Sequence, residues 1–302
     1  MDATAAQVRI GVSGWRYAPW RSGFYPPGLA QVRELAFAAR QFPAIELNGS
    51  FYSLQRPSSY QRWAAETPDG FVFAVKAPRY ITHVLRLRNA QQALANFLAS
   101  GVLALGAKLG PVLWQLPPSL AFDEPLLDTF LEQLPRDTGA ALTLARSREP
   151  ERTQGREWLE PVEPWRLRHA LEVRHPSFCQ PRTVALLRRH GVALVVADAP
   201  GEWPEVGDIT ADFMYLRLHG AQQLYASGYT ASQLAAWAER IRAWAAGSAP
   251  QDVRRLSDVP LPSHGPRNVF CFFDNTGESH APRDALALAR RLALDEQLRI
   301  RC

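Results

Sequence analysis

The chain has 302 residues, of which 47% are hydrophobic and 21% are charged, so it can bury the core of one large domain rather than two small ones. Its net charge of +5, from 34 basic and 29 acidic residues, allows binding to nucleic acid without indicating it. No segment approaches the roughly 18 apolar residues of a membrane span, and the N-terminus lacks a signal-peptide core. We therefore expect a cytoplasmic protein without membrane contact.

Eight short apolar runs follow one another along the chain, and each ends on a polar or charged residue. The runs span residues 8–13, 44–48, 71–76, 111–115, 169–174, 192–198, 213–219 and 268–274. Helical patterns separate most of them. This alternation predicts a single (β/α)8 TIM barrel that occupies residues 1–302.

Local sequence signals place the helices between these runs. We expect helices over residues 29–42, 89–105, 123–134, 181–190 and 231–246, and a short helix that Ser58 and Ser59 can cap and that runs through Ala65. Asp123 is available as an N-cap, Gly191 follows the end of its helix, and Thr230 with Gln233 forms a capping box.

Two segments break the alternation. Residues 135–168, between the fourth and fifth strands, are long and rich in Arg, Glu and Pro, which predicts an excursion of loop and helix. Residues 199–212, after the sixth strand, contain too much Pro and Gly for a full helix, so we expect a reduced or missing helix there.

The polar residues at the strand ends are the candidate site residues, because active sites of this fold lie at the carboxyl ends of the strands. Period-two alternation in the seventh strand puts Tyr215, Arg217 and His219 on the face opposite Met214 and Leu216. The apolar face must meet the helices, so the polar face points into the barrel. The same reasoning, or position alone, adds the other expected inward residues: Glu46, Asn48, Lys76, Gln115, Glu172, Arg174, Asp198 and Asp274.

Charges buried in this end of the barrel must be paired, bound to a ligand, or both. His219 is the best acid/base candidate, because its ordinary pKa lies near neutrality; the other candidate catalytic residues are Glu172, Glu46 and Asp198. Lys76 is either an electrostatic clamp on an anion or the buried partner of Glu46. The expected ligand-contacting residues are Lys76, Arg174, Arg217, Asn48, Gln115, Tyr215, Asp274 and Asn275.

Cofactors are not indicated by the motifs. Carboxylates and His219 can build a divalent metal site, but no H-E-x-x-H or paired H-x-H motif is present and nearby cations oppose it, so we do not favour a metal. The turn after the first strand has only a lone G-x-x-G, a weak phosphate signal. The aromatic residues that follow it could stack a base or a sugar or could plug the barrel mouth as core, and we favour the second: Trp15, Tyr17, Trp20, Phe24 and Tyr25. The cysteines Cys179, Cys271 and Cys302 lie far apart, which predicts free thiols.

Seven ordered motifs resemble one known family. GVSGWRYAPW, IELNGSFY, FAVKAPRYITH, GPVLWQLPPS, LRHALEVRHPSF, YLRLHG and FCFFDNT, spread over residues 10–292, are similar to domain-of-unknown-function family 72, the YecE-like proteins. The resemblance implies a TIM barrel and no established activity. A further likeness to the endonuclease IV barrel would imply DNA binding, although the zinc-ligand histidines of that enzyme are not visible here. Thr276 also departs from the more usual acidic residue of the last motif.

Three functions fit these observations. The leading interpretation is an enzyme that acts on a small anionic, phosphorylated substrate, with Arg174, Arg217 and Lys76 holding the anion and His219 or Glu172 transferring a proton. The alternatives are a nucleic-acid-binding or endonuclease-like protein and a non-catalytic ligand-binding barrel.

Overall fold

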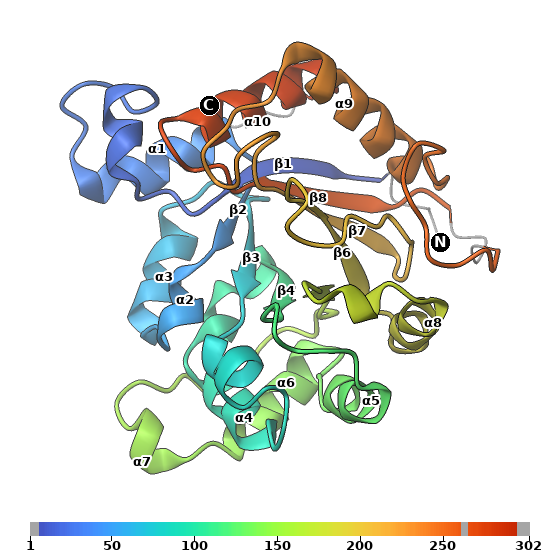
Figure 1. Cartoon of the computed structure of the whole chain (residues 1–302). Helices are drawn as coiled ribbons and strands as arrows, with labels where there is room; N and C mark the ends of the chain where they lie inside the picture. The colour runs from blue at the N-terminus through green and yellow to red at the C-terminus, as the bar shows by residue number, and fades with distance from the viewer. Residues whose placement is uncertain (1–5, 261–264, 295–302) are drawn as a thin grey trace.

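The computed structural model describes residues 6–260 and 265–294, in which eight parallel strands close into a barrel (Figure 1). Each strand pairs with its neighbours in sequence, and β1 closes the ring by pairing with β8. The strands are β1 (Val8–Ser13), β2 (Ala44–Leu47), β3 (Val72–Lys76), β4 (Leu109–Gln115), β5 (His169–Glu172), β6 (Ala193–Asp198), β7 (Phe213–Leu218) and β8 (Asn268–Phe273). The predicted (β/α)8 barrel is confirmed.

The helices lie outside the strands, and α9 and α10 pack on each other beside β1 and β8 (Figure 1). None of the described helices is long and apolar enough to cross a membrane. The α-helices are α1 (Glu34–Gln41), α2 (Gly49–Tyr52), α3 (Pro57–Ala65), α4 (Gln91–Ala99), α5 (Glu124–Glu132), α6 (Thr138–Arg146), α7 (Pro150–Thr153), α8 (Pro181–His190), α9 (Ala231–Ala245) and α10 (His280–Arg291). Short 3-10 helices cover Ala18–Ser22, Gln31–Arg33, Val102–Lys108 and Pro176–Phe178, and a π-helix covers Tyr80–Val84.

Three of the expected helix ends are confirmed, whereas the helices expected over residues 29–42 and 89–105 are shorter, Glu34–Gln41 and Gln91–Ala99. Asp123 caps α5 by accepting a hydrogen bond from Leu126 N, and the Thr230 capping box begins α9. Gly191 ends α8 with a φ of 59°. The expectation that Ser58 or Ser59 caps α3 is wrong: the helix begins one residue earlier, at Pro57, because the ring presets the helical φ and needs no N–H partner.

Both interruptions of the alternation are confirmed. The long excursion between β4 and β5 carries α6 and α7 and then runs without a helix to Arg168. No helix forms over residues 199–212, all of which the structure describes. Cys179 and Cys271 are free, and Cys302 lies outside the described residues.

Small and aromatic side chains fill the barrel interior, so the fold encloses a packed core rather than a channel. They come from alternate positions of the strands: Ala44, Val72, Ala74, Leu113, Ala170, Ala193, Val195, Phe213, Tyr215, Phe270 and Phe272. The next inward positions toward the carboxyl ends of the strands are mostly polar. The core therefore stops where the candidate site begins.

Gly11 lets β1 and β2 approach each other. A Cβ at this position would lie 2.0 Å from the carbonyl oxygen of Ala44, its partner across the ladder. We predict that Gly11→Ala lowers the free energy of unfolding by about 3 kcal/mol or more, because the backbone must shift to relieve the clash. Urea denaturation measures the change. Gly265→Ala is the matched control, because a Cβ there meets nothing within 4 Å; equal stability of the two variants would contradict the argument.

Candidate active site

The guanidinium of Arg217, on β7, organises the barrel mouth, the end where the carboxyl termini of the strands meet. Its Nε and Nη2 donate to the two carboxylate oxygens of Glu46 at 3.0 and 2.8 Å. Nη1 donates to Glu172 Oε2 at 2.7 Å, and Nη2 also donates to Asp274 Oδ2 at 2.9 Å. The Arg217 side chain is only 1% exposed. One cation therefore joins a carboxylate on β2, a carboxylate on β5 and a carboxylate directly after β8.

This pairing fixes the charge state of the carboxylates. Burial alone would raise the pKa of Glu172, but the charges of Arg217 and Arg174 outweigh it and hold that pKa well below its usual range. The pKa of Asp274 is likewise lowered against the effect of burial, chiefly by Arg217. Burial would lower the pKa of Arg217, but Asp274 and Glu46 raise it well above its ordinary value. The ion pairs thus persist at neutral pH.

Glu172 also binds the side chains of Gln115, at the end of β4, and Arg174, which follows β5. Its Oε1 accepts from Gln115 Nε2 at 3.0 Å and from Arg174 Nε at 2.8 Å. The guanidinium carbon of Arg174 lies 3.5 Å from the centroid of the Trp203 ring, and the side chain remains 10% exposed. Arg174 Nη2 lies 2.7 Å from Glu172 Oε1 but is buried without a hydrogen-bond partner among the described residues. Arg174 is therefore fixed on two sides and keeps a donor for a ligand.

His219 and Asp274 form a second pair at the mouth. His219 Nδ1 lies 3.1 Å from Asp274 Oδ2, and its Nε2 lies 3.5 Å from Arg217 Nη1. The rings of Trp203 and Tyr225 pack edge-on against the imidazole, with centroids 5.1 and 5.4 Å away. Nδ1 makes no hydrogen bond among the described residues, so this contact is an electrostatic one, and an imidazole beside a carboxylate can serve in general acid–base catalysis.

Lys76 is a cation of the barrel mouth that forms no salt bridge with a described residue. Its Nζ lies 4.1 Å from the centroid of the Phe51 ring and has no ion-pair partner within 4.0 Å among the described residues. Burial, followed by the charge of Arg217, lowers the pKa of this amine to about 8. The alternative that Lys76 is the buried partner of Glu46 is wrong, because Arg217 occupies both oxygens of that carboxylate.

Glu46 and Tyr215 lie beneath this ring of charges. Tyr215 donates to Glu46 Oε2 at 2.7 Å, and Ser13 Oγ donates to Glu46 Oε1 at 2.7 Å. Burial raises the pKa of Tyr215 well above its ordinary value, so its hydroxyl stays protonated. Both side chains are fully buried. Tyr215 binds Glu46 and Glu46 binds Arg217, so the two residues hold the guanidinium in position from the core side of the mouth.

Asp198 departs from its expected inward position. In β6 the interior core receives Ala193 and Val195, so Asp198 falls on the opposite face. There it hydrogen-bonds Tyr229, which precedes α9, and Trp237, which lies on α9. Burial raises the pKa of Asp198. The expectation that Asp198 lines the mouth is wrong.

The two asparagine candidates lie at the edge of the arrangement. Asn275 is buried and donates to Asp284 Oδ2 at 2.9 Å and to the Ser227 carbonyl at 3.0 Å, so it ties the loop after β8 to α10. Asn48 is half-buried, hydrogen-bonds Tyr17, and has a buried Oδ1 without a partner. Arg217 also differs from its expected role, since three carboxylates, not an incoming anion, occupy its donors.

Several aromatic residues were missed. Phe51 and Trp203 cover the two remaining cations of the mouth, but they lie in a one-turn helix and in an irregular segment, where no periodicity reveals the direction of a side chain. The expected aromatic core after β1 is confirmed: Trp15, Trp20 and Tyr25 are buried, with Tyr17 and Phe24 packed against them.

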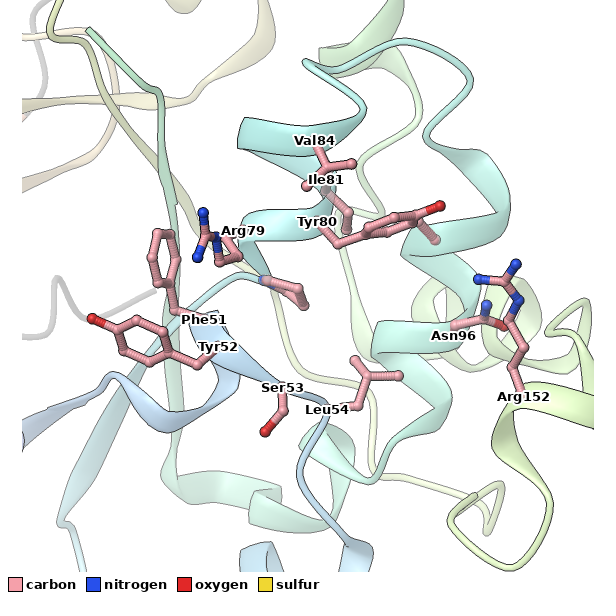
Figure 2. Close-up of a pocket in the computed structure, with 12 residues that line it drawn as sticks. Phe51, Tyr52, Ser53, Leu54, Arg79, Tyr80, Ile81, Val84, Asn96 and Arg152 are labelled. Carbon is pink, nitrogen blue, oxygen red and sulfur yellow. The ribbon is translucent and has the colours of Figure 1, made fainter.

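An apolar pocket lies beside the mouth, between α2, the π-helix after β3 and α4 (Figure 2). Its volume is about 340 Å³. Phe51 is one of its lining residues, and the Phe51 ring also contacts the Lys76 amine. Exposed apolar side chains gather here, with Tyr52 72% exposed and Tyr80 and Val84 beside it. The residues that the structure describes contain no group of three or more His, Cys, Asp or Glu side chains suited to a metal ion.

We predict that Arg217→Met lowers the free energy of unfolding at neutral pH by about 3–5 kcal/mol, because it strands buried carboxylates. The carboxylates whose pKa is depressed in the parent contribute stability above a pH of about 4 and lose that contribution as pH falls. The difference between variant and parent should therefore shrink on acidification. Denaturant titrations from neutral to acidic pH measure it. Arg240→Met, which breaks the surface pairs to Glu205 and Asp252, should cost less than about 1 kcal/mol. A similar cost for both variants would refute the role given to Arg217.

We predict that Lys76→Met raises the free energy of unfolding at neutral pH by about 1–3 kcal/mol, because an amine with a lowered pKa is destabilising while it is charged. The unfolded chain binds the proton up to its ordinary pKa of 10.5, so the parent gains stability as pH rises from about 8 to that value. The advantage of the variant should fall over that range. Thermal and denaturant unfolding at both pH values test this, and a destabilised variant at neutral pH would contradict it.

Comparison with known proteins agrees with this architecture. Solved structures of DUF72 family proteins from Thermotoga maritima and Enterococcus faecalis superpose with TM-scores of 0.71 and 0.66, at 24% and 16% identity. Each alignment covers 95% of this chain, and 99% and 96% of those chains respectively. At these identities the likeness shows the fold.

Two curated relatives match part of the chain. The protein YunF of Bacillus subtilis is 33% identical over 116 residues, which is 37% of this chain and 40% of YunF. YecE of Escherichia coli is 31% identical over 129 residues, 42% of this chain and 44% of YecE. Both are named as UPF0759 proteins, and the matched region spans less than half of either. The profile of the family described as "Protein of unknown function DUF72" matches residues 9–301, so the chain belongs to the DUF72 family.

Proposed function

We propose that this chain is an enzyme that acts on a small anionic substrate, such as a phosphate ester, at the barrel mouth. The observation that carries the proposal is the set of charged groups buried there around Arg217. Removing such groups from water costs several kcal/mol per ion, and apolar side chains of similar volume often give greater stability. A chain that keeps them at the end where barrel active sites lie gains function, not stability, from them.

The cations favour an anionic substrate. The positive charge of Arg217 offsets part of the negative charge of Glu46, Glu172 and Asp274. Those carboxylates therefore repel an incoming anion less than their number suggests. Arg174 and Lys76 then remain as donors at the mouth. Arg174 offers a guanidinium that Glu172 and Trp203 hold in place and whose Nη2 makes no hydrogen bond among the described residues, and Lys76 offers an ammonium without a salt bridge. A planar fork and a point charge together suit a phosphate or carboxylate group.

His219 is the residue best placed to transfer a proton. Its Nδ1 lies 3.1 Å from the Asp274 carboxylate, while the depressed pKa of Glu172 keeps that carboxyl ionised and unsuited to donate a proton at neutral pH. Glu46 has both oxygens occupied by hydrogen-bond donors, so its role is to position Arg217. The substrate thus meets Arg174 and Lys76 first and His219 beneath them.

The test is binding of glycerol 3-phosphate and inorganic phosphate, measured by calorimetry and by thermal shift. We expect the parent to bind at least one of them, and Arg174→Met to weaken that binding about tenfold or more through the loss of charge-assisted hydrogen bonds. Binding should also weaken as pH rises through about 8, where Lys76 loses its proton.

Arg240→Met is the matched control, because it removes an equal charge that pairs with Glu205 and Asp252 instead of the mouth carboxylates, and it should leave the affinity unchanged. Absence of binding by the parent, or equal affinity of Arg174→Met and the parent, would defeat the proposal.

A further inference from the structure

The sequence uses lysine very sparingly. Of the 34 basic residues only two are lysines, Lys76 and Lys108, and all others are arginines. Arginine serves for ion pairs throughout this chain, so a retained lysine needs a chemical reason that arginine does not meet. An amine differs from a guanidinium in two ways: it is a compact triple donor, and it can lose its proton and attack an electrophile.

Lys108 has the first kind of reason. Its Nζ donates to the carbonyl oxygens of Ala64 and Thr67, both at 2.6 Å, and to Thr67 Oγ1 at 3.3 Å. These acceptors use the three hydrogens of an ammonium group. Lys108 is therefore explained as a structural clamp between α3 and the segment before β4.

Lys76 has no such explanation. Its Nζ donates no hydrogen bond to any residue that the structure describes, and it lies 4.1 Å from the centroid of the Phe51 ring. The three carboxylates nearby are already bound by arginines. Arginine stacks on an aromatic ring as well as lysine does, so the contact with Phe51 does not require an amine.

We propose that Lys76 is a nucleophile that forms an imine with the carbonyl group of the substrate. This deepens the proposed function and rests on it, since it makes the substrate a small aldehyde or ketone that also carries an anionic group. Phe51 shields one side of the amine and the strand end fixes its direction, which leaves the barrel mouth as the approach for the carbonyl carbon.

The reaction is balanced without an oxidant or a reductant. The nitrogen lone pair attacks the carbonyl carbon, and the carbonyl oxygen leaves as water with the two hydrogens of the neutral amine. A proton from solvent then charges the imine, which makes it an electron sink. Burial and the charge of Arg217 bring the pKa of Lys76 to about 8, so a useful fraction of the amine is neutral near physiological pH. Arg174 is placed to hold the anionic group while the carbonyl reacts.

Reductive trapping tests the inference on the unmodified chain. The protein is incubated with glyoxylate and cyanoborohydride, which convert an imine into carboxymethyl-lysine, and peptide mass spectrometry follows each lysine. Lys108 is the internal control. We expect Lys76 to react about tenfold faster than Lys108 at neutral pH, with a rate that rises through a midpoint near 8. Equal or slower modification of Lys76 would overturn the inference.

A second aldehyde separates this inference from the proposed function. Formaldehyde carries no charge, so Arg174→Met should slow trapping of Lys76 by glyoxylate about tenfold and leave trapping by formaldehyde unchanged. Fast trapping by both aldehydes that ignores Arg174→Met would support the nucleophile and count against anion recognition. Binding of phosphate that depends on Arg174, together with an unreactive Lys76, would preserve the proposed function and refute the imine.

Discussion

The contact of one guanidinium with three carboxylates governs the barrel mouth. Arg217 reaches Glu46, Glu172 and Asp274 at 2.7–3.0 Å and so links residues from opposite sides of the barrel. Without this cation, like charges in a poorly hydrated space would repel one another or take up protons. With it, Glu172 and Asp274 stay ionised at neutral pH, and Glu172 also accepts a hydrogen bond from Arg174.

The same contact explains why Lys76 stands apart. Because Arg217 and Arg174 take the carboxylates, the amine is left over the Phe51 ring, next to a charge of its own sign. A buried ammonium in that position lowers the stability of the fold, which is a common property of residues that act on a substrate. The adjoining apolar pocket, which shares Phe51 as a wall, gives a ligand room to extend beyond the charged groups.

The fold and the end of the barrel that carries the candidate site could be predicted from the sequence, because each apolar run ends on a polar residue and the side chains of β7 alternate clearly between polar and apolar. The direction of Asp198 could not. Its strand is apolar on both faces, as buried parallel strands are, and such a run carries no period-two signal to tell inside from outside. Nor does a sequence state which carboxylate meets which cation. Arg217 was expected to hold an anion, and its three carboxylate partners could not be foreseen because they come from distant strands. Trp203 lies in a segment without periodicity, so its place over Arg174 followed only from the coordinates.

The most direct test of this account is the ionisation of Lys76 in the folded protein. Since the chain contains two lysines, isotopic labelling of lysine side chains gives two NMR signals, and Lys76→Arg assigns them. The account predicts that the Lys76 amine titrates with a midpoint near 8 and that Arg217→Met shifts this midpoint upward, because Arg217 is one cause of the lowered pKa. A midpoint near the ordinary value of 10.5 in the parent would contradict it, since Lys76 would then be a solvated or paired cation instead of a buried amine poised beside Arg217.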